Sequence, residues 1–339
     1  MFISCRVVSA ALSAAMIAAS ALAGSVVAPE AARAEVGAKP APPPGPTPLT
    51  NFPAAFALSM LAPEQSPPGA NDWSCKPSET HPEPVVLVHG TFANAYNAWA
   101  YVAPALKREG YCVYAVNYGG RRGNPIKGTG DIRLSARTLR DFVNRVRKAS
   151  GARQVSLVGH SQGGMMPRWY LKYEGGTDPA HPERNKVARL VTLAGTHHGT
   201  SIMGVNSILD ILGVQEQAGR VISTAAVQQG TGSRLLLALN RGGDTMPGVR
   251  YTVLGTRYDE VATPYRQTFL SAGPGASVHN VVLQNGCEVD LTDHLGITYD
   301  PRTLHYIKNA LDPKRADTSV GRAATCQPFF PVAGPPLSE

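Results

Sequence analysis

The chain has 339 residues, of which 43% are hydrophobic and 17% are charged, so its composition is that of a globular protein and excludes a disordered one. Its formal net charge is +8, but the basic residues are scattered along the chain and form no stripe interleaved with aromatic residues. We therefore expect no nucleic-acid partner. The length suits one large domain, and we expect a monomer.

The N-terminus carries the pattern of a targeting segment. An apolar stretch from Val7 to about Ala28 follows a short segment that contains Arg6, and Ala32-Arg33-Ala34 then fits a cleavage site. This pattern predicts a secretory signal peptide over residues 1–34 and a secreted, extracellular protein. The alternative is a membrane anchor, because the stretch is nearly long enough to span a bilayer. No later segment is long and apolar enough to span a bilayer, so we expect no stable membrane span in the mature chain.

The segment after the signal peptide is rich in proline. Residues 35–50 include the run Ala41–Pro46 and carry no core pattern, so we expect an extended linker there. The remaining residues, 51–339, are expected to form one folded domain, with residues 51–84 wrapping its edge.

Four cysteines remain when Cys5 of the leader is set aside, and an even count in an exported chain implies two disulfides. Four cysteines allow three pairings. We favour Cys75–Cys112 and Cys287–Cys326, because each pair brackets neighbouring elements of the chain. None of the four has the spacing of zinc ligands, and we expect no metal.

Apolar runs typical of buried strands alternate with helical patterns along the chain. Strands are expected at Val85–Val88, Cys112–Val116, Val155–Val158, Val187–Leu193, Tyr251–Leu254 and Val278–Leu283, and helices near Ala98–Glu109, at Asp131–Ala149, up to about Glu174 and at Pro301–Leu311. This alternation predicts an α/β protein with a mainly parallel central sheet and helices on both faces. Residues 197–248 interrupt the rhythm and are expected to form a small insertion.

One motif carries the first indication of chemistry. The pentapeptide Gly159-His160-Ser161-Gln162-Gly163 is a G-x-S-x-G sequence between an expected strand and an expected helix. In the α/β-hydrolase fold this is the nucleophile elbow, a sharp turn that exposes the serine hydroxyl. Its glycines avoid collisions with the neighbouring strand and helix. The alternative is a Gly-rich turn of an unrelated α/β domain.

A serine hydroxyl needs a base in contact with it and a carboxylate that orients the base. In α/β-hydrolases the acid and then the histidine follow the serine along the chain. Asp259 follows a late strand and is the expected acid, with Asp293 in reserve. His294 lies in the loop between the last strand and the last helix and is the expected base, because His279 lies in the strand and His305 in the helix.

Two backbone N–H groups should stabilise the oxyanion. One belongs to Gln162, after the nucleophile, and the other to Thr91, in the loop after the first strand, where the Thr91 hydroxyl is a third possible donor. Expected walls of an apolar substrate pocket are Phe92, Met165, Val261 and the insertion, and His197 and His198 are expected near the site. The apolar stretch Ile202–Val214 is either a mobile lid or a core-facing helix.

The segments around His89–Phe92, Gly159–Gly164, Asp259–Pro264 and Asp293–Gly296 resemble the secreted class 2 bacterial lipases, over about residues 70–312. The early cysteine pair also resembles that of the yeast-type lipase B. The resemblance implies a catalytic α/β-hydrolase domain with triacylglycerol lipase or carboxylesterase activity and no cofactor. Some bacterial lipases carry a structural calcium ion, but no convincing carboxylate cluster occurs in this sequence.

The resulting hypothesis is a secreted serine ester hydrolase that acts on triacylglycerols and other acyl esters, with a lipid or ester as its partner, presented at an interface. The alternatives are a cutinase-like polyesterase or an acyltransferase with the same triad, which differ in pocket shape and water access. A non-catalytic binding module is disfavoured, because candidates for all three triad members are present.

Overall fold

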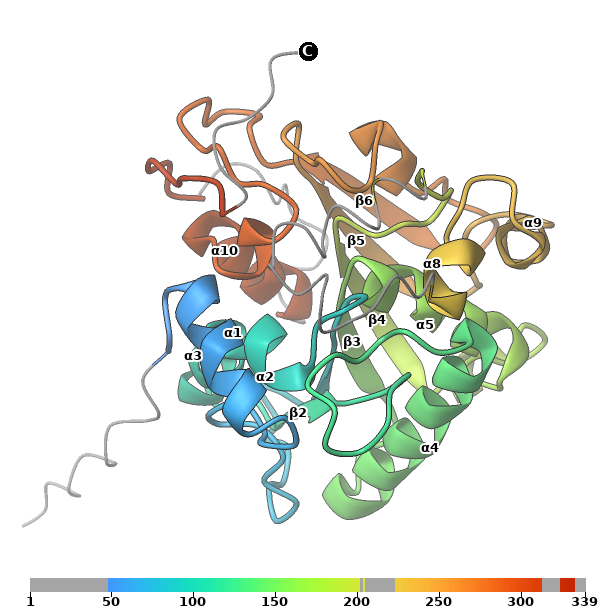
Figure 1. The fold of residues 1–339 in the computed structure, drawn as a ribbon. Helices are drawn as coiled ribbons and strands as arrows, with labels where there is room; N and C mark the ends of the chain where they lie inside the picture. Colours follow the sequence, from blue (N-terminus) through green and yellow to red (C-terminus); the bar gives the residue numbers. More distant parts are fainter. Residues whose placement is uncertain (1–47, 202–203, 205–222, 313–323, 333–339) are drawn as a thin grey trace, which may run out of the picture. The chain divides into compact units, whose positions relative to one another are not determined.

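Parallel strands form the centre of the structure (Figure 1). The computed structural model describes residues 48–201, 204, 223–312 and 324–332. Within them a six-stranded sheet runs in the order β2-β1-β3-β4-β5-β6, and every neighbouring pair is parallel. The strands are β1 (Val85–Val88), β2 (Val113–Val116), β3 (Val155–His160), β4 (Val187–Leu193), β5 (Arg250–Gly255) and β6 (Ser277–Val282). The predicted parallel sheet is confirmed, with strand ends within two residues of those expected.

Helices connect the strands and cover the sheet. They are α1 (Phe52–Leu61), α2 (Ala95–Trp99), α3 (Val102–Arg108), α4 (Ile132–Ser150), α5 (Gln162–Tyr173), α8 (Thr224–Gln228), α9 (Arg234–Asn240) and α10 (Pro301–Leu311), with 3-10 turns η1 (Pro182–Arg184), η2 (Tyr265–Thr268) and η3 (Gly296–Thr298). Asp131 caps α4 by accepting from the Arg133 and Leu134 N–H groups, and Gly151 ends it in a left-handed conformation. The single helix expected near Ala98–Glu109 is instead two, α2 and α3.

The two faces of the sheet have separate cores. Side chains alternate along a strand, so Val86 and Val88 of β1 pack with α4 and α5, whereas Val85 and Leu87 pack with α2, α3 and α10. Figure 1 shows these helix groups on opposite sides of the strands. Because both faces are covered, every residue of β1, β2, β3 and β4 is buried.

Residues 51–84 contain a helix that the sequence analysis did not predict. Asn51 caps α1 by accepting from the Ala54 N–H at 3.0 Å, and Ser59 accepts a hydrogen bond from Asn97 of α2 at 3.0 Å. The ten residues of α1 include no charged side chain and have no polar face, so no helical periodicity marks them. None of the helices in the described part of the chain is long and apolar enough to cross a membrane.

Other expectations concern residues outside the described part. The signal peptide and nearly all of the Pro-rich linker lie there, as does the apolar stretch Ile202–Val214 apart from Gly204, and with it the question of a lid. The described part of the insertion contributes α8 and α9.

Two disulfides tie loops to the sheet. Cys75 is bonded to Cys112, which directly precedes β2, and Cys287, after β6, is bonded to Cys326. These are the two pairings favoured from the order of elements. The second bridge holds the segment 324–332, whose Phe329 pairs with Asp290 in a short β-bridge.

The turn from β3 to α5 is crowded by backbone. A Cβ atom added to Gly159 would overlap the Gly163 carbonyl group, and one added to Gly163 would overlap the carbonyl oxygens of Val88 and His89. The start of α5 therefore lies directly against the end of β1, and no side chain fits between them.

Removal of the first bridge should destabilise the fold. Cys75 and Cys112 are 37 residues apart, and closing a loop of this size contributes about 3–4 kcal/mol in the chain-entropy model. The Cys75→Ser/Cys112→Ser variant should therefore unfold at lower urea concentration with a free energy of unfolding reduced by about that amount. An unchanged midpoint would show that the bridge does not constrain the unfolded chain.

Gly163→Ala should prevent normal folding, because the new Cβ displaces main-chain carbonyl groups that cannot rotate away. We expect a free energy of unfolding lower by roughly 3 kcal/mol or more, or no soluble protein. Gly130→Ala is the matched control, because its Cβ meets nothing closer than 3.4 Å. Equal urea midpoints for the two variants would contradict the steric argument.

Candidate active site

Ser161 occupies the turn between β3 and α5. Its φ of 55° and ψ of −123° are unusual for a residue with a side chain, a strain of roughly 1–3 kcal/mol that the surrounding structure must offset. Its N–H donates to the Leu193 carbonyl and its carbonyl accepts from Gly164, both at 2.9 Å. The fold thus holds the serine in one conformation at the carboxyl edge of the sheet.

The expected acid and base lie together at this edge. His294 Nδ1 lies 2.8 Å from Asp259 Oδ1, and both side chains are fully buried. The same Asp259 oxygen accepts the N–H groups of Val261 at 3.0 Å and Ala262 at 2.6 Å, which fixes the carboxylate. His294 Nε2 is enclosed without a hydrogen-bond partner among the described residues. The bond to Asp259 sets the tautomer that leaves Nε2 as the free acceptor.

The residue before Ser161 connects the elbow to the histidine. His160 Nε2 donates to the His294 carbonyl at 2.8 Å, and the two rings lie 4.9 Å apart. Burial holds the pKa of His160 well below its usual range, so this ring is neutral. Burial would also lower the pKa of His294. It is nevertheless raised, because Asp259 contributes both a negative charge and a hydrogen bond, and Glu260 and Asp293 contribute further negative charge. Of these two histidines, His294 is therefore the one whose surroundings favour the protonated form.

The loop after β1 lies against the serine. A Cβ on Gly90 would come within 3.0 Å of the Ser161 Cβ, so only a glycine fits at this contact without displacement. His89, one residue earlier, stacks on Tyr118, and burial lowers the pKa of His89 to about 4. Its ring is therefore a neutral support for the loop that carries Thr91.

The hydroxyl of Thr91 accepts two hydrogen bonds. Gln162 Nε2 donates to Thr91 Oγ1 at 2.9 Å and Gln229 Nε2 at 2.8 Å. Both amide orientations follow from main-chain acceptors, since Gln162 also donates to the Gly128 carbonyl and Gln229 to the Ala225 carbonyl. With both lone pairs engaged, the Thr91 hydroxyl can only donate its proton. Gln229 is not among the predicted site residues, because nothing in the sequence places α8 beside this loop.

Glu260 is a second residue that the sequence analysis missed. Its Oε2 accepts the backbone N–H of His294 at 3.1 Å. Asp293, the reserve acid, instead accepts the Gly296 N–H at 2.6 Å, at the start of the turn η3. The only sign of Glu260 in the sequence is that an acidic residue follows Asp259, and the direction in which its side chain points depends on the conformation of the loop.

The alternative histidines lie elsewhere. His279 is exposed on β6, and His305 is hydrogen-bonded to Asn309 on α10. His198 lies 3.0 Å from Asp244, which also pairs with the buried Arg168. His198 is thus engaged by a carboxylate other than Asp259.

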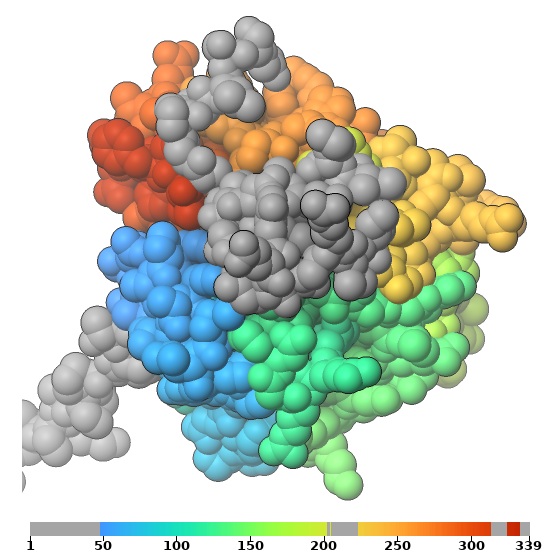
Figure 2. Space-filling view, in the orientation of Figure 1, coloured from blue at the N-terminus to red at the C-terminus, as the bar shows by residue number. Residues whose placement is uncertain are grey.

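The expected pocket walls fall into two groups. Phe92 and Val261 belong to one apolar cluster with Leu295, the neighbour of His294, and with residues of α1. Met165, on α5, lies in the other core, together with residues of α4 and of the strands, and is fully buried. Phe56 of α1 and Phe329 pack against the first cluster, and Figure 2 shows α1 and the segment 324–332 on the same face.

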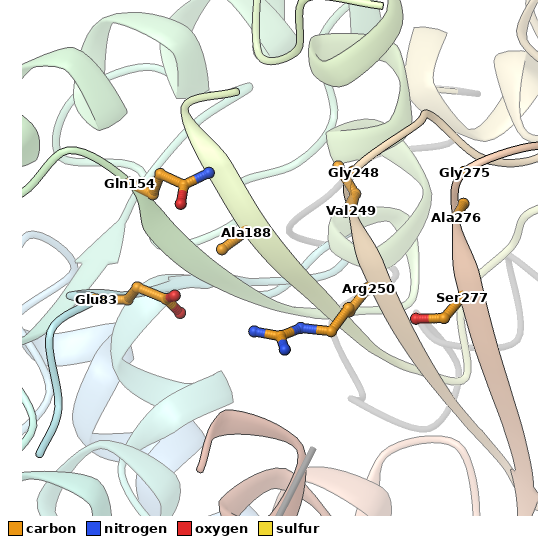
Figure 3. A pocket seen from close by; sticks show the side chains of 9 residues that line it. All are labelled: Glu83, Gln154, Ala188, Gly248, Val249, Arg250, Gly275, Ala276 and Ser277. Carbon is orange, nitrogen blue, oxygen red and sulfur yellow. The ribbon is translucent and has the colours of Figure 1, made fainter. Parts of the chain in front are cut away.

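A separate cavity of about 440 Å³ lies at the opposite, amino-terminal edge of the sheet (Figure 3). Glu83, Gln154, Arg250 and Ser277 are among its lining residues, and no member of the Ser161 site is. In the described residues no group of three or more His, Cys, Asp or Glu side chains could hold a metal ion.

Comparisons with known proteins agree with this arrangement. Triacylglycerol lipases of Pseudarthrobacter phenanthrenivorans and Burkholderia plantarii are each 29% identical over 199 residues, which is 57% of this chain and 56% and 49% of theirs. This chain thus spans about half the length of the curated relatives that it matches. The crystal structure of Aspergillus fumigatus lipase B matches 74% of this chain and 58% of its own, with a TM-score of 0.55 and 20% identity, which shows the shared fold.

The α/β-hydrolase fold with its mainly parallel sheet is therefore established by the strand order and by this structural neighbour. The model of the family Lipase (class 2) matches residues 82–296, a range that begins just before β1 and ends just after His294. The chain belongs to the class 2 lipase family.

Proposed function

We propose that this protein is a serine ester hydrolase that cleaves acyl esters, triacylglycerols among them, through an acyl-enzyme. The observation that carries the proposal is the buried Asp259–His294 hydrogen bond at the edge where the strained turn presents Ser161. The relatives named triacylglycerol lipase support the substrate class.

In the proposed mechanism Ser161 Oγ attacks the ester carbonyl carbon and His294 Nε2 takes the hydroxyl proton. His294 then gives this proton to the leaving alcohol, and water releases the acyl group by the same steps in reverse. Asp259 holds the imidazole in the required tautomer and stabilises the imidazolium. The enclosed Nε2, which has no competing partner among the described residues, is consistent with this role.

The oxyanion would be held by the backbone N–H groups of Thr91 and Gln162 and by the Thr91 hydroxyl. The two amide groups that donate to Thr91 Oγ1 support the role of this hydroxyl as an oxyanion donor, because they occupy both of its lone pairs and leave its proton free to be donated. Phe92, Val261 and Leu295 are the proposed apolar walls for the acyl chain.

We also propose export, with a signal peptide over residues 1–34, a linker over 35–50 and the catalytic domain over 51–339. The two disulfides support export, because such bridges persist in oxidising compartments. The relatives named triacylglycerol lipase support an ester presented by a lipid aggregate.

Ser161→Ala and His294→Ala should each lower kcat on a soluble p-nitrophenyl ester by something on the order of 10⁶-fold, and the double variant should be little worse, because the residues act as a unit. Asp259→Ala should cost less. A fluorophosphonate probe should label Ser161 in the native protein and fail on Ser161→Ala.

His305→Ala is the matched control and should retain activity. If His294→Ala stays active while His305→Ala or His279→Ala is dead, the proposed base is wrong. If the native protein is neither labelled nor active on any ester from acetate to long-chain triacylglycerol emulsions, the enzymatic proposal fails as a whole.

Thr91→Val should lower kcat by on the order of 10²-fold with a nearly unchanged KM, because it removes a donor that acts on the developing oxyanion. Thr91→Ser keeps the hydroxyl and should retain most of the activity. A similar loss in both variants would mean that Thr91 acts through packing and that its hydroxyl does not reach the oxyanion.

A further inference from the structure

Two consecutive carboxylates from the loop after β5 hold the same histidine at two different points. Asp259 accepts the ring Nδ1–H of His294 at 2.8 Å, and Glu260 accepts its backbone N–H at 3.1 Å. Because the residues are adjacent, one short loop determines both the orientation of the imidazole and the position of its main chain.

Glu260 lies in a largely buried environment, where its charge acts strongly on neighbouring titratable groups. Its Oε1 is enclosed and has no hydrogen-bond partner among the described residues. Burial, reinforced by the charges of Asp259 and Asp293, raises the pKa of Glu260 to about 7, while His294 acts in the opposite direction. These are the charged groups that act on it from its own loop and from the loop after β6. Conversely, the charge of Glu260 is one of the causes that raise the pKa of His294.

We propose that Glu260 is a positioning residue for the catalytic histidine: its carboxylate fixes the His294 main chain and, when ionised, adds a second negative charge that stabilises the imidazolium. The inference rests on the function proposed above. When His294 takes the serine proton, a positive charge forms in a site closed to solvent, where a nearby carboxylate acts more strongly than in water.

The negative charge of Glu260 also couples the titration of Glu260 to that of His294, and its sign determines in which direction the pKa of His294 moves. An ionised Glu260 stabilises protonated His294, so it speeds the transfer of the serine proton to His294. It also raises the pH below which His294 is already protonated and can no longer act as a base. Because Glu260 itself takes up a proton near pH 7, two protons should bind across the acid limb of the native enzyme.

The decisive variant is Glu260→Gln, which keeps a carbonyl oxygen for the His294 N–H and removes only the charge. We expect kcat on a soluble p-nitrophenyl ester at pH 8.5 to fall roughly ten-fold with KM within about two-fold, as for a charge interaction worth one pKa unit. The acid limb of kcat/KM should move to lower pH and follow a single proton. Glu260→Ala also loses the main-chain contact and should be slower still.

Glu288→Gln removes an exposed carboxylate from the segment before His294 and should leave the pH profile unchanged. If Glu260→Gln keeps the native kcat and acid limb, or loses activity equally at all pH values with a lower Tm, the residue is merely structural and the inference is overturned.

A spectroscopic measurement keeps the inference testable if the variants are too slow to assay. The low-field NMR signal of the His294 Nδ1 proton should titrate at lower pH in Glu260→Gln than in the native protein, and an unchanged midpoint would refute the coupling. Labelling of Ser161 by the fluorophosphonate probe in the native protein separates this outcome from failure of the proposed function itself.

Discussion

The contact between the start of α5 and the end of β1 is the steric constraint on which the site depends. Gly159 and Gly163 leave no Cβ atoms in this space, so the helix begins directly against the Val88 and His89 carbonyl groups. The contact brings the Thr91 loop up to Ser161 and forces the serine backbone into a strained conformation. The proposed nucleophile and the loop that carries the proposed oxyanion donors are thus positioned by main-chain packing.

Electrostatics then distinguish histidines that are equally buried. His89 and His160 lie at the same edge of the sheet, and burial is the largest cause that lowers the pKa of each ring and keeps it neutral. His294 alone of these three has carboxylates around it, which outweigh the same desolvation and raise its pKa. The fold therefore concentrates negative charge around the one imidazole that is proposed to carry a proton during the reaction.

Polar contacts join the insertion to the site. Thr196 donates to Gln229 Oε1 at 2.9 Å, and Gln229 in turn donates to Thr91 Oγ1. This chain runs from the end of β4 through α8 to the loop after β1. Gln229, at the end of the short helix α8, thus orients the Thr91 hydroxyl, because its side-chain amide has both a donor and an acceptor.

The local sequence pattern determined the elements of this protein. The strands at Val85–Val88 and Val187–Leu193 and the helix at Pro301–Leu311 have the ends expected. The first strand is a continuous apolar run, the second is mostly apolar, and Asp300 caps the helix. The G-x-S-x-G motif was sufficient to predict Ser161, and chain order then predicted Asp259 and His294, since each follows a different strand and parallel strands end at one edge.

Only the tertiary structure decided which other side chains meet there. Met165 was predicted to be a pocket wall from its place after Ser161, but on α5 its side chain packs into the core with residues of α4 and of the strands. Gln229 reaches Thr91 across 138 residues, and Glu260 turns toward the His294 main chain because the loop after β5 folds back on the loop after β6. Local periodicity carries no information about such contacts, because they depend on how separate elements pack against one another.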